Sequence, residues 1–496
     1  MTRNVAELIL SAGRRRPEAR IGIAESPWQL GRAVSASSGA AEAFRALGVA
    51  PGSRVALIGG TSMSYLLAWL ALQLAGAEAA LLNPQYPDDL LAHMLTDLRP
   101  ETVICVRRSE AHTVPAGVRH IHADDLDQMI LSIDGAPIAI EPSSRPPLGL
   151  RRNPLDTAGY MHTSGTSGVP KFCIQTHEYF LRLGRFVADS LCLSRADTVL
   201  APLPMFHINP LGYGVVGGLT GNSDILTVSR FSASAFWPTV VTTGTTVLIL
   251  HAPHVAILNR ASTEADARDH RVRLVFYADE AFLARFAVPL GVSCYGSTEA
   301  GGLSHTWVWR QGQDAALGEV IARYGGRCRD DLTWRLNDAG EILVKELQAG
   351  TLFSGYVRGA DIDAALDEDG WFHTGDLGRI DEVGNLIFVE RASESIRVKG
   401  EFVPIGYVET TFAAIESLEE VALWRRPGEL GDDELILYAV GETLPIDDLR
   451  RTAQTLPDFM RPRAVVRVAA LPRDTGVGKL RRRELADSPV LDDITL

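Results

Sequence analysis

Cysteine is scarce in this sequence: 5 of 496 residues are cysteines, and they lie far apart, without a CxxC pair or a histidine at zinc-finger spacing. This excludes a disulfide scaffold and indicates free thiols in a reducing cytoplasm. An excess of positive charge is also missing, because 48 Lys and Arg face 61 Asp and Glu for a net charge of -13. A chain of this sign repels phosphate backbones, so nucleic acid is not an expected partner.

Long apolar runs are missing as well. Residues 1–16 carry arginines but no uninterrupted apolar segment or small-residue cleavage site, so a signal peptide is not expected. The most apolar stretch, residues 65–82, is interrupted by Gln73 and Glu78. It predicts a buried helix followed by a strand rather than a membrane span.

What the sequence does have is ordinary globular composition, with 46% hydrophobic and 22% charged residues. Its length favours two or more domains. Short β-branched runs at residues 54–59, 102–106, 158–162 and 272–276 predict strands, each followed by helix-compatible sequence. Strands that alternate with helices predict an α/β fold with mostly parallel sheets and helices on their faces.

The sequence pattern changes after about Tyr356, where closely spaced Asp and Gly predict a meander of hairpins. We place a domain boundary near Arg391. This gives an N-terminal domain, residues 1–390, and a C-terminal domain, residues 391–496. In the second domain, residues 396–398, 421–424 and 435–440 predict strands interleaved with helices.

A loop rich in hydroxyl groups and glycine follows the strand predicted at residues 158–162. It contains Thr163, Ser164, Gly165, Thr166, Ser167, Gly168 and Lys171. Such a loop offers backbone N–H groups, hydroxyl donors and one cation to a polyphosphate. It lacks the Walker spacing GxxxxGK[ST], and by composition alone an ordinary surface turn is the more frequent outcome.

This loop resembles the signature loop of the adenylate-forming superfamily, and further segments in the family's order extend the resemblance over nearly the whole chain. Residues 295–299 (YGSTE) resemble the second signature, in which Tyr295 and Gly296 would contact adenine, Thr298 the α-phosphate and Glu299 Mg²⁺. Residues 371–376 (WFHTGD) resemble the third, in which Asp376 would bind the ribose hydroxyls.

Two segments resemble the family's mobile C-terminal part. In residues 390–400, Arg391 would contact the ribose, Ser393 would be the hinge and Gly400 would line the pantetheine tunnel. In residues 472–479 (PRDTGVGK), Lys479 would be the catalytic lysine. The resemblance implies a large N-terminal domain with a small β-barrel-like subdomain, followed by a small mobile α+β domain.

Residues 203–209 (LPMFHIN) resemble the segment whose histidine, here His207, gates the acid site of acyl-CoA ligases. Amino-acid-activating relatives carry Asp there, so an α-amino acid is disfavoured. The apolar, small-residue stretch at residues 211–218 suggests room for a bulky nonpolar acid or, equally, tight helix packing. The residues assigned to the acid site are His207, Gly212, Tyr213, Phe276, Tyr277 and Ala300. Aryl, fatty and polycyclic acids stay open.

The sequence departs from the family at residues 276–280 (FYADE), where relatives carry a Gly/Ala/Pro turn beside adenine, and at Phe172, where glycine is usual. Bulky or acidic residues there would narrow the nucleotide site or place negative charge near ATP. Four activities therefore stay open: a full ligase, a ligase that only thioesterifies an acyl-adenylate made elsewhere, a carrier-protein loading ligase, and a non-catalytic acyl-binding protein.

The resemblance favours the full reaction, an AMP-forming acyl-CoA synthetase. A carboxylic acid would react with ATP to form an acyl-adenylate and pyrophosphate, and the thiol of coenzyme A would then displace AMP. Both steps build negative charge, which Mg²⁺ and the Lys479 ammonium would offset. The expected cofactors are ATP/AMP, Mg²⁺ and coenzyme A. The expected partners are the acid or acyl-adenylate and coenzyme A, with a homodimer left open.

Overall fold

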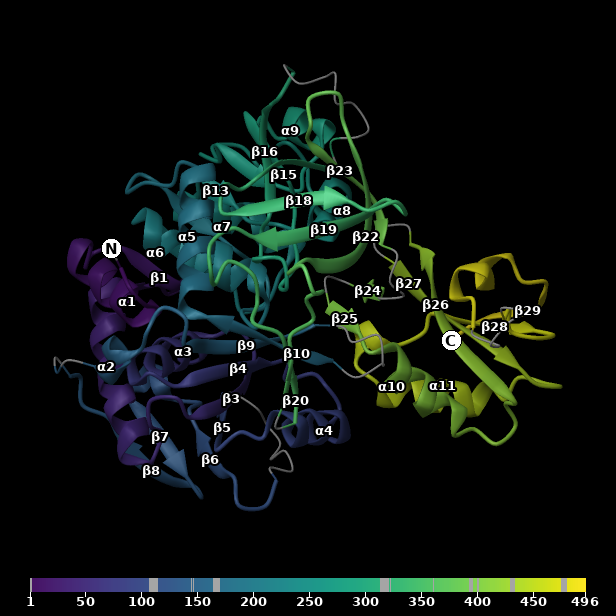
Figure 1. The fold of residues 1–496 in the computed structure, drawn as a ribbon, viewed down its shortest axis with the longest axis horizontal. Coiled ribbons are helices and arrows are strands. Elements are labelled where there is room, and N and C mark those ends of the chain that lie inside the picture. The colour runs from purple at the N-terminus through teal and green to yellow at the C-terminus, as the bar shows by residue number, and fades with distance from the viewer. Residues whose placement is uncertain are drawn as a thin grey trace. The chain divides into compact units, whose positions relative to one another are not determined.

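The computed structural model describes residues 2–106, 115–143, 145, 147–163, 170–312, 321, 323–359, 361–391, 396–398, 401–428, 433–473 and 480–496 (Figure 1). The chain divides into two compact units. Unit 1 comprises Met1–Pro84, Leu95–His162 and Phe172–Ala392, and unit 2 comprises Gln85–Met94, Thr163–Lys171 and Ser393–Leu496.

One sheet of unit 1 is parallel at its centre, where β9, β4, β3, β5 and β6 lie side by side. Its strand order is β21 (Asp361–Asp363), β20 (Tyr356–Arg358), β10 (Lys171–Thr176), β9 (Thr157–Thr163), β4 (Glu78–Leu82), β3 (Arg54–Gly59), β5 (Thr102–Val106), β6 (Arg119–His122), β7 (Ile130–Ile133) and β8 (Ala136–Ala139). The loop that resembles the first signature joins β9 to β10, which are neighbours in this sheet.

The second sheet is parallel from β1 to β15 and antiparallel from β15 to β18. Its strand order is β18 (Leu332–Leu336), β19 (Glu341–Glu346), β22 (Phe372–Ile380), β23 (Leu386–Arg391), β17 (Tyr324–Cys328), β16 (His305–Arg310), β15 (Leu290–Tyr295), β14 (Leu274–Phe276), β13 (Val247–Leu248), β11 (Thr198–Leu200), β12 (Asp224–Thr227), β1 (Arg20–Ile23) and β2 (Trp28–Gln29). The antiparallel part is the meander predicted after about Tyr356, which begins earlier, at β16.

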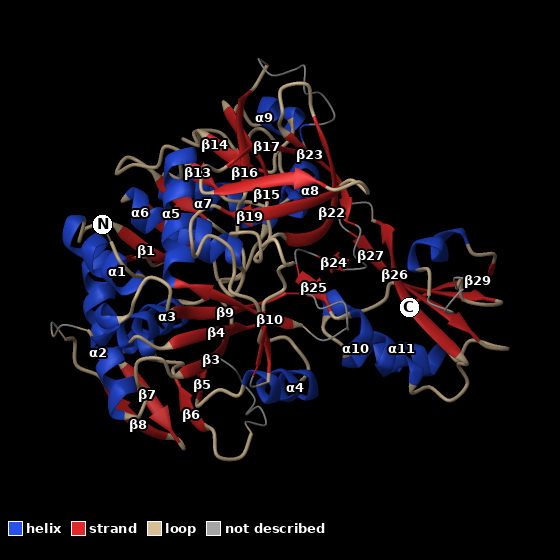
Figure 2. Cartoon of the chain, in the orientation of Figure 1, coloured by secondary structure: helices blue, strands red, loops and turns tan. Residues whose placement is uncertain are grey.

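Helices cover both faces of the second sheet (Figure 2). They are α1 (Val5–Arg15), α2 (Leu30–Ala46), α3 (Met63–Ala75), α5 (His177–Ser190), the π-helix η3 (Asn209–Val216), α6 (Gly217–Gly221), α7 (Ala233–Thr243), α8 (Ala252–Ala261) and α9 (Glu280–Arg285). The 3₁₀ turns η1 (Leu126–Gln128) and η2 (Leu148–Arg151) lie in the connections, and α4 (Asp88–Leu98) spans the two units.

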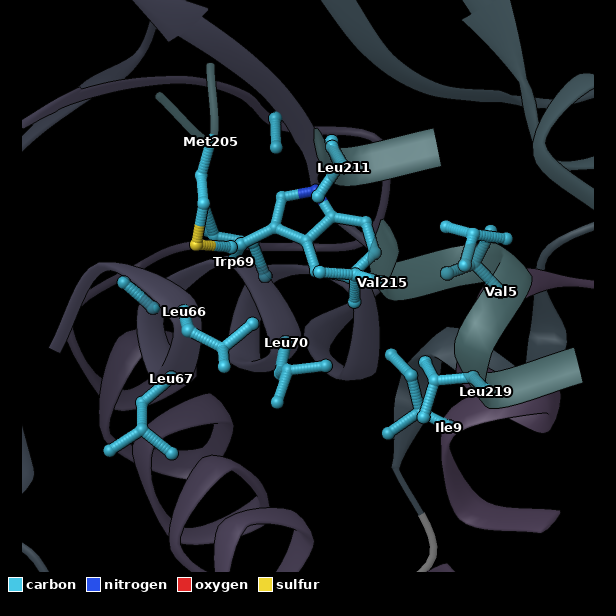
Figure 3. Packing of buried hydrophobic residues seen from close by; sticks show 14 of the residues in the cluster. Val5, Ile9, Leu66, Leu67, Trp69, Leu70, Met205, Leu211, Val215 and Leu219 are labelled. Atoms are coloured by element: carbon cyan, nitrogen blue, oxygen red, sulfur yellow. The ribbon is translucent and has the colours of Figure 1, made fainter. Parts of the chain in front are cut away.

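Successive strand residues point to different cores, as the period of a strand requires. Val247 joins the core that includes α1, α2, α3 and α5, whereas Leu248 joins the core against α7, α8 and α9. The helix α3 is buried along its whole length, which explains why its sequence is apolar on every side. Its Trp69 lies among Leu211 and Val215 of η3 and Leu70 of α3 (Figure 3).

The predicted α/β class is confirmed, and the runs at residues 54–59, 65–82 and 102–106 form the predicted elements. One detail was wrong. The strand predicted at residues 158–162 is followed by a second strand, β10, before the helix α5 begins. Hydroxyl-bearing residues and glycine, which separate the two strands in the sequence, favour a turn between two strands as much as a turn from a strand into a helix.

Unit 2, in the residues that the structure describes, has an α+β arrangement of a two-stranded hairpin, a four-stranded mixed sheet and helices. Its elements are β24 (Ile396–Val398), β25 (Glu401–Val403), α10 (Ile405–Ala413), β26 (Glu420–Pro427), β27 (Asp433–Val440), α11 (Ile446–Thr455), η5 (Asp458–Met460), β28 (Ala464–Val468), η6 (Arg482–Asp487) and β29 (Val490–Thr495). Among the helices described in either unit, none combines the length and the apolar character needed to cross a membrane.

Candidate functional site

Three residues expected to contact adenosine are Tyr295, Asp376 and Arg391. The first ends β15, and the other two lie opposite each other on the paired strands β22 and β23. Tyr295 is the last residue of β15, and its hydroxyl donates a hydrogen bond to the Asp376 carboxylate at 2.9 Å. Asp376 on β22 lies opposite Arg391 on β23 in the strand register. Tyr295 and Asp376 are 7% and 2% exposed, so this polar pair is buried. Residues 81 positions apart thus form one polar cluster.

The loop after Tyr295 folds back on itself. The Gly302 N–H donates to the Ser297 carbonyl at 2.9 Å, and the Ala300 N–H donates to the Ser297 hydroxyl at 3.1 Å. Gly301 and Gly302 have φ values of 74° and 76°, which disfavour any residue with a Cβ. Gly296 is needed for a different reason, because a Cβ there would lie 2.4 Å from the Gly302 carbonyl oxygen. The result is a tight loop over residues 296–302.

Glu299, the expected metal ligand, is held by its neighbours. Its Oε1 accepts a hydrogen bond from the Tyr356 hydroxyl at 3.1 Å, and its carbonyl accepts from the Phe353 N–H at 3.2 Å. Burial raises the pKa of Tyr356 well above its usual range, and the Glu299 charge raises it further. Tyr356 is therefore a neutral donor at working pH, and it holds the Glu299 carboxylate in one place.

Sequence reasoning missed two buried residues that hold this loop. The Tyr179 hydroxyl donates to the Thr298 carbonyl at 2.8 Å. Arg329, 4% exposed, donates to the carbonyls of Gly301 and Leu303 at 3.2 Å each, and it forms an ion pair with Asp331. Both residues lie outside the signatures, and their type and spacing carry no signal without the fold.

A single carboxylate at this loop fits Mg²⁺, which binds proteins through one or two carboxylates and keeps waters and substrate phosphates as its other ligands. Within the described residues, no group of three or more His, Cys, Asp or Glu is placed to hold a metal ion. Glu299 therefore fits an ion that a nucleotide brings with it, rather than a resident all-protein metal centre.

The residues expected around the acid approach the same loop from η3 and from the strand β14. The Tyr213 hydroxyl of η3 donates to the Gly302 carbonyl at 2.7 Å. Its ring stacks on Phe276, with ring centroids 6.0 Å apart. Tyr277 continues the row, 6.3 Å from Phe276 and 4.7 Å from His251, on which it stacks. The four rings form a continuous aromatic row that ends at the signature loop.

His207 precedes η3 and is half-buried. Its ring lies against Phe206 in an edge arrangement at 4.7 Å and is 6.1 Å from the ring of His162. His162 is the residue before Thr163, and its Nδ1 lies 2.9 Å from the Leu81 carbonyl oxygen. His207 is therefore close to the strand that leads into the first signature loop. Ala300, also assigned to the acid, is fully buried in the core beneath Tyr295.

The glycines of residues 211–218 do not supply the open space expected for a bulky acid. A Cβ on Gly212 would lie 2.6 Å from a Leu183 methyl carbon, and a Cβ on Gly217 would lie 2.8 Å from Val187. Both contacts are with α5. The small residues let η3 approach this helix closely, so the alternative of tight helix packing is the correct one.

Tyr277, in the turn at residues 276–280, has a strained backbone conformation. It has a φ of 59°, a region that residues with a Cβ rarely adopt. Its hydroxyl is hydrogen-bonded to the Cys294 thiol, whose pKa burial raises to about 12. Strain of this kind costs of order 1–3 kcal/mol and is found most often at functional sites.

The acidic residues of this turn are used by the fold. The Asp279 carboxylate accepts the Phe282 N–H at 2.7 Å and caps α9. Glu280 accepts the Gly312 N–H at 2.7 Å. Both carboxylates of residues 276–280 are thus hydrogen-bonded within the fold. The feature of this turn that could still narrow a nucleotide site is the size of Phe276 and Tyr277.

The remaining predicted residues stand as follows. Thr163 ends β9 and Lys171 begins β10, with Phe172 buried behind it. Ser164, Gly165, Thr166, Ser167, Gly168, Ser393, Gly400 and Lys479 lie outside the described residues.

The base of the Lys479 loop is described in unit 2. Arg473 and Leu480 form a β-bridge, which joins the two ends of the loop. Arg482, in the basic run of residues 481–483, forms a bidentate ion pair with Glu409 of α10. The Glu409 carboxylate also accepts the Leu423 N–H of β26 at 2.7 Å. The loop therefore starts from a fixed base on the sheet.

We expect Gly296→Ala to lower the free energy of unfolding by about 1–3 kcal/mol, the usual cost of overpacking. The added Cβ meets backbone, at 2.8 Å from Leu303 Cα, so the loop must move. Displacing catalytic groups by about 1 Å can cost 10²-fold in rate. ATP–pyrophosphate exchange should therefore fall by about that factor.

Gly60→Ala is the matched control for this change, since its Cβ would meet nothing within 4 Å. Equal losses in both variants, measured by denaturant unfolding and exchange, would contradict the role given to Gly296.

A second prediction concerns acid stability. Burial lowers the pKa of His305, whose ring lies 5.9 Å from that of Tyr295, to about 3, and it lowers the pKa values of His177 and His254 to about 4. The unfolded chain, with histidine pKa values near 6.5, then binds more protons than the folded chain below about pH 6.5. Stability should be full above that pH and fall by about 1.4 kcal/mol per unit for each histidine as the pH drops towards 4.

Unfolding midpoints between pH 7.5 and 4.5 test this, and His305→Gln should make the decline shallower. The contrasting control is His373→Gln, because Glu341 raises the pKa of His373 and its charged form stabilises the fold at low pH. A stability that stays constant down to pH 4.5 would refute the prediction.

Comparison with known proteins agrees with this geometry. The family model for AMP-binding enzymes matches residues 31–357, well over half of the chain. A crotonobetaine/carnitine–CoA ligase of Escherichia coli is 27% identical over 474 residues, which cover 90% of each protein. The relative from Proteus mirabilis with the same name is also 27% identical, with the same coverage.

Two solved structures share the fold. An o-succinylbenzoate CoA synthetase from Bacillus subtilis, bound with a product analogue, superposes with a TM-score of 0.83 at 21% identity, covering 98% of this chain and 99% of the other. A fatty acyl CoA synthetase of Mycobacterium tuberculosis has a TM-score of 0.67 at 22% identity, with the same coverage.

Proposed function

The chain belongs to the AMP-binding enzymes, and we propose that it converts a carboxylic acid through an acyl-adenylate into its coenzyme A thioester. The observation that carries this proposal is the buried Tyr295–Asp376 hydrogen bond, which lies next to Arg391 and at the start of the loop that holds Glu299. Curated relatives that match 90% of the chain are named CoA ligases, which supports the thiol acceptor.

In the proposed first step, the acid carboxylate attacks the α-phosphate of ATP and pyrophosphate leaves. Asp376 accepts hydrogen bonds from the ribose hydroxyls, and Tyr295 forms one wall of the adenine site. Thr298 donates to the α-phosphate, and the loop from Thr163 to Lys171 binds the departing phosphates. Glu299 would hold Mg²⁺, which would supply positive charge to the phosphates.

In the second step, the thiolate of coenzyme A attacks the acyl carbon and AMP leaves. We assign Lys479 to the first step and Gly400 to the second. The rotation of residues 391–496 about Ser393 would then exchange the two, so that one site serves both reactions.

We further propose that the acid is mainly apolar, and aryl in particular. Tyr277 is half-buried and stands at the end of a row of rings that continues through the buried Phe276 and Tyr213 to the signature loop, so its ring is the apolar surface that we assign to the acid. Flat rings favour an aromatic acyl group by offset or edge contacts, worth about 0.5–1.5 kcal/mol per pair beyond burial. Fatty and polycyclic acids remain competing members of the same class.

The test is ATP–pyrophosphate exchange over aryl, fatty and polycyclic acids, run beside thioester formation from prepared acyl-adenylates with coenzyme A and with a carrier protein. Exchange together with a coenzyme A thioester supports the full ligase. Thioester formation from adenylates without exchange would indicate that Tyr277 and Phe276 have disabled the first step. The absence of both reactions would contradict the proposal and favour a binding protein.

A further inference from the structure

The side chain of Asn209 is buried without a hydrogen-bond partner. It is 5% exposed, and within the part of the chain that the structure describes neither its amide nitrogen nor its amide oxygen is hydrogen-bonded. Folded proteins pair the large majority of such groups, and each exception calls for a bound molecule or a functional reason. Asn4, by contrast, is fully buried and hydrogen-bonded at both ends of its amide.

The position of Asn209 shows where its partner would come from. It is the first residue of the π-helix η3, two residues after His207. In a π-helix a residue shares a face with the residues four and five positions later, here Tyr213 and Gly214. Leu211 and Val215 lie on the other face, against Trp69 of α3 (Figure 3). Asn209 therefore lies on the face that Tyr213 directs to Phe276 and Gly302.

The π-helix is a second and independent observation. Such helices are rare, because the widened turn packs less well, and they are frequent at functional sites. Here the widened turn contains both Asn209 and Tyr213, whose hydroxyl donates to the signature loop.

We propose that Asn209 is a specificity-determining residue that binds a polar substituent of the acid, so the substrate is a mainly apolar acid that carries a hydroxyl group. This inference rests on the proposed function. A carboxamide offers one acceptor oxygen and an NH₂ donor. A hydroxyl both donates and accepts, so it satisfies both ends of the buried amide, whereas a C–H at the same place satisfies neither.

The experiment compares acids that differ by a single hydroxyl group, using the full chain. The pairs are benzoate with its 2-, 3- and 4-hydroxy forms, cinnamate with 4-hydroxycinnamate, and octanoate with 3-hydroxyoctanoate. Sites built to hydrogen-bond a substrate hydroxyl reject the analogue that lacks it, so kcat/KM should favour one hydroxy acid by about 10²-fold or more. In Asn209→Leu this ratio should fall towards one.

Unfolding midpoints distinguish a role of Asn209 in substrate specificity from a role in the stability of the fold. Replacing an unpaired buried amide by a side chain of the same size is neutral or stabilising, so Asn209→Leu should keep or raise the midpoint. Asn4→Leu should lower it, because that amide caps α1 and is paired. If Asn209→Leu lowers the midpoint as Asn4→Leu does and changes all acids equally, the residue is structural and the inference is overturned.

Calorimetric binding of the same acid pairs, in the presence of ATP, distinguishes the two proposals. Thioester formation with equal kcat/KM for every pair would overturn this inference and leave the proposed function standing. Selective binding of a hydroxy acid that Asn209→Leu abolishes, without any turnover, would support the inference and overturn the function. The absence of selectivity in both binding and turnover would mean that a water satisfies the amide, against the inference.

Discussion

Lys479→Ala should lower ATP–pyrophosphate exchange by about 10³-fold, because a single preorganised group that stabilises transition-state charge is worth roughly 10²–10³ in rate. Attack of a carboxylate on the α-phosphate brings two anions together, and we assign this ammonium to that step. The thiol step from a supplied acyl-adenylate starts with the phosphate already transferred, so its rate should change little. The measurement is both half-reactions on the same preparation.

The structure supplies a control for this variant in unit 2. Arg481 lies two residues beyond Lys479, is exposed, and forms an ion pair with Glu484. Arg481→Ala removes the same charge from the same region and should leave both half-reactions intact. A bulky residue at Gly400 should give the reverse pattern, a loss of the thiol step alone. Equal loss of both half-reactions in Lys479→Ala would contradict the division of labour.

The base of the loop that contains Lys479 is held by contacts of the described residues on either side of it. The Arg473–Leu480 bridge closes the loop, and Arg482 fixes the following residues to Glu409. Removing one partner of a half-buried ion pair leaves the other charge unpaired, so Glu409→Gln would disturb the loop without touching the lysine. Contacts outside the motif of residues 472–479 therefore fix the residues that flank it.

Sequence predicts this molecule well where the information is local. The strand at Arg54–Gly59 and the fully buried α3 follow from hydrophobic pattern, and the segments around Tyr295 and Asp376 follow from contiguous motifs. What the motifs do not state is that the Tyr295 hydroxyl meets Asp376, because that contact depends on the pairing of distant strands.

Three features were missed or misread for the same physical reason. Arg329 and Tyr179 hold the signature loop through single hydrogen bonds to carbonyls, and no periodicity or spacing marks such residues. The glycines of η3 suggested space, but they allow close helix packing, which only the neighbouring helix reveals. Asn209 stands inside a quoted motif, yet its missing partners are visible only in three dimensions.

Tyr277 and Asn209 bear on the same chemical question. Tyr277 and Asn209 both depart from a relaxed structure, one in backbone conformation and the other in hydrogen bonding. Real proteins violate local rules mainly at functional sites. Tyr277 belongs to the aromatic row and Asn209 to the helix that carries Tyr213, so both departures lie in the part of the chain that we assign to the acid.

The other large effect is expected for Glu299→Gln. This change keeps the size and the Tyr356 hydrogen bond but removes the charge that we assign to Mg²⁺. Exchange should fall by about 10²–10³-fold, and part of the loss should return at high Mg²⁺, since a neutral amide binds this hard cation more weakly. Thioester formation from a supplied adenylate needs no triphosphate-bound metal, so it should be affected less.

Tyr356→Phe is the companion variant, because it keeps the charge and removes only the donor that orients it. The loss of one hydrogen bond to a charged group is worth about 1.5–3 kcal/mol, so exchange should fall by roughly 10- to 150-fold without a change of charge at the metal. In the double variant the loss of exchange, expressed as free energy, should be smaller than the sum of the losses in the two single variants, because the tyrosine acts through the carboxylate. Additive losses, or an unchanged Mg²⁺ requirement in Glu299→Gln, would show that Glu299 supports the loop rather than the metal.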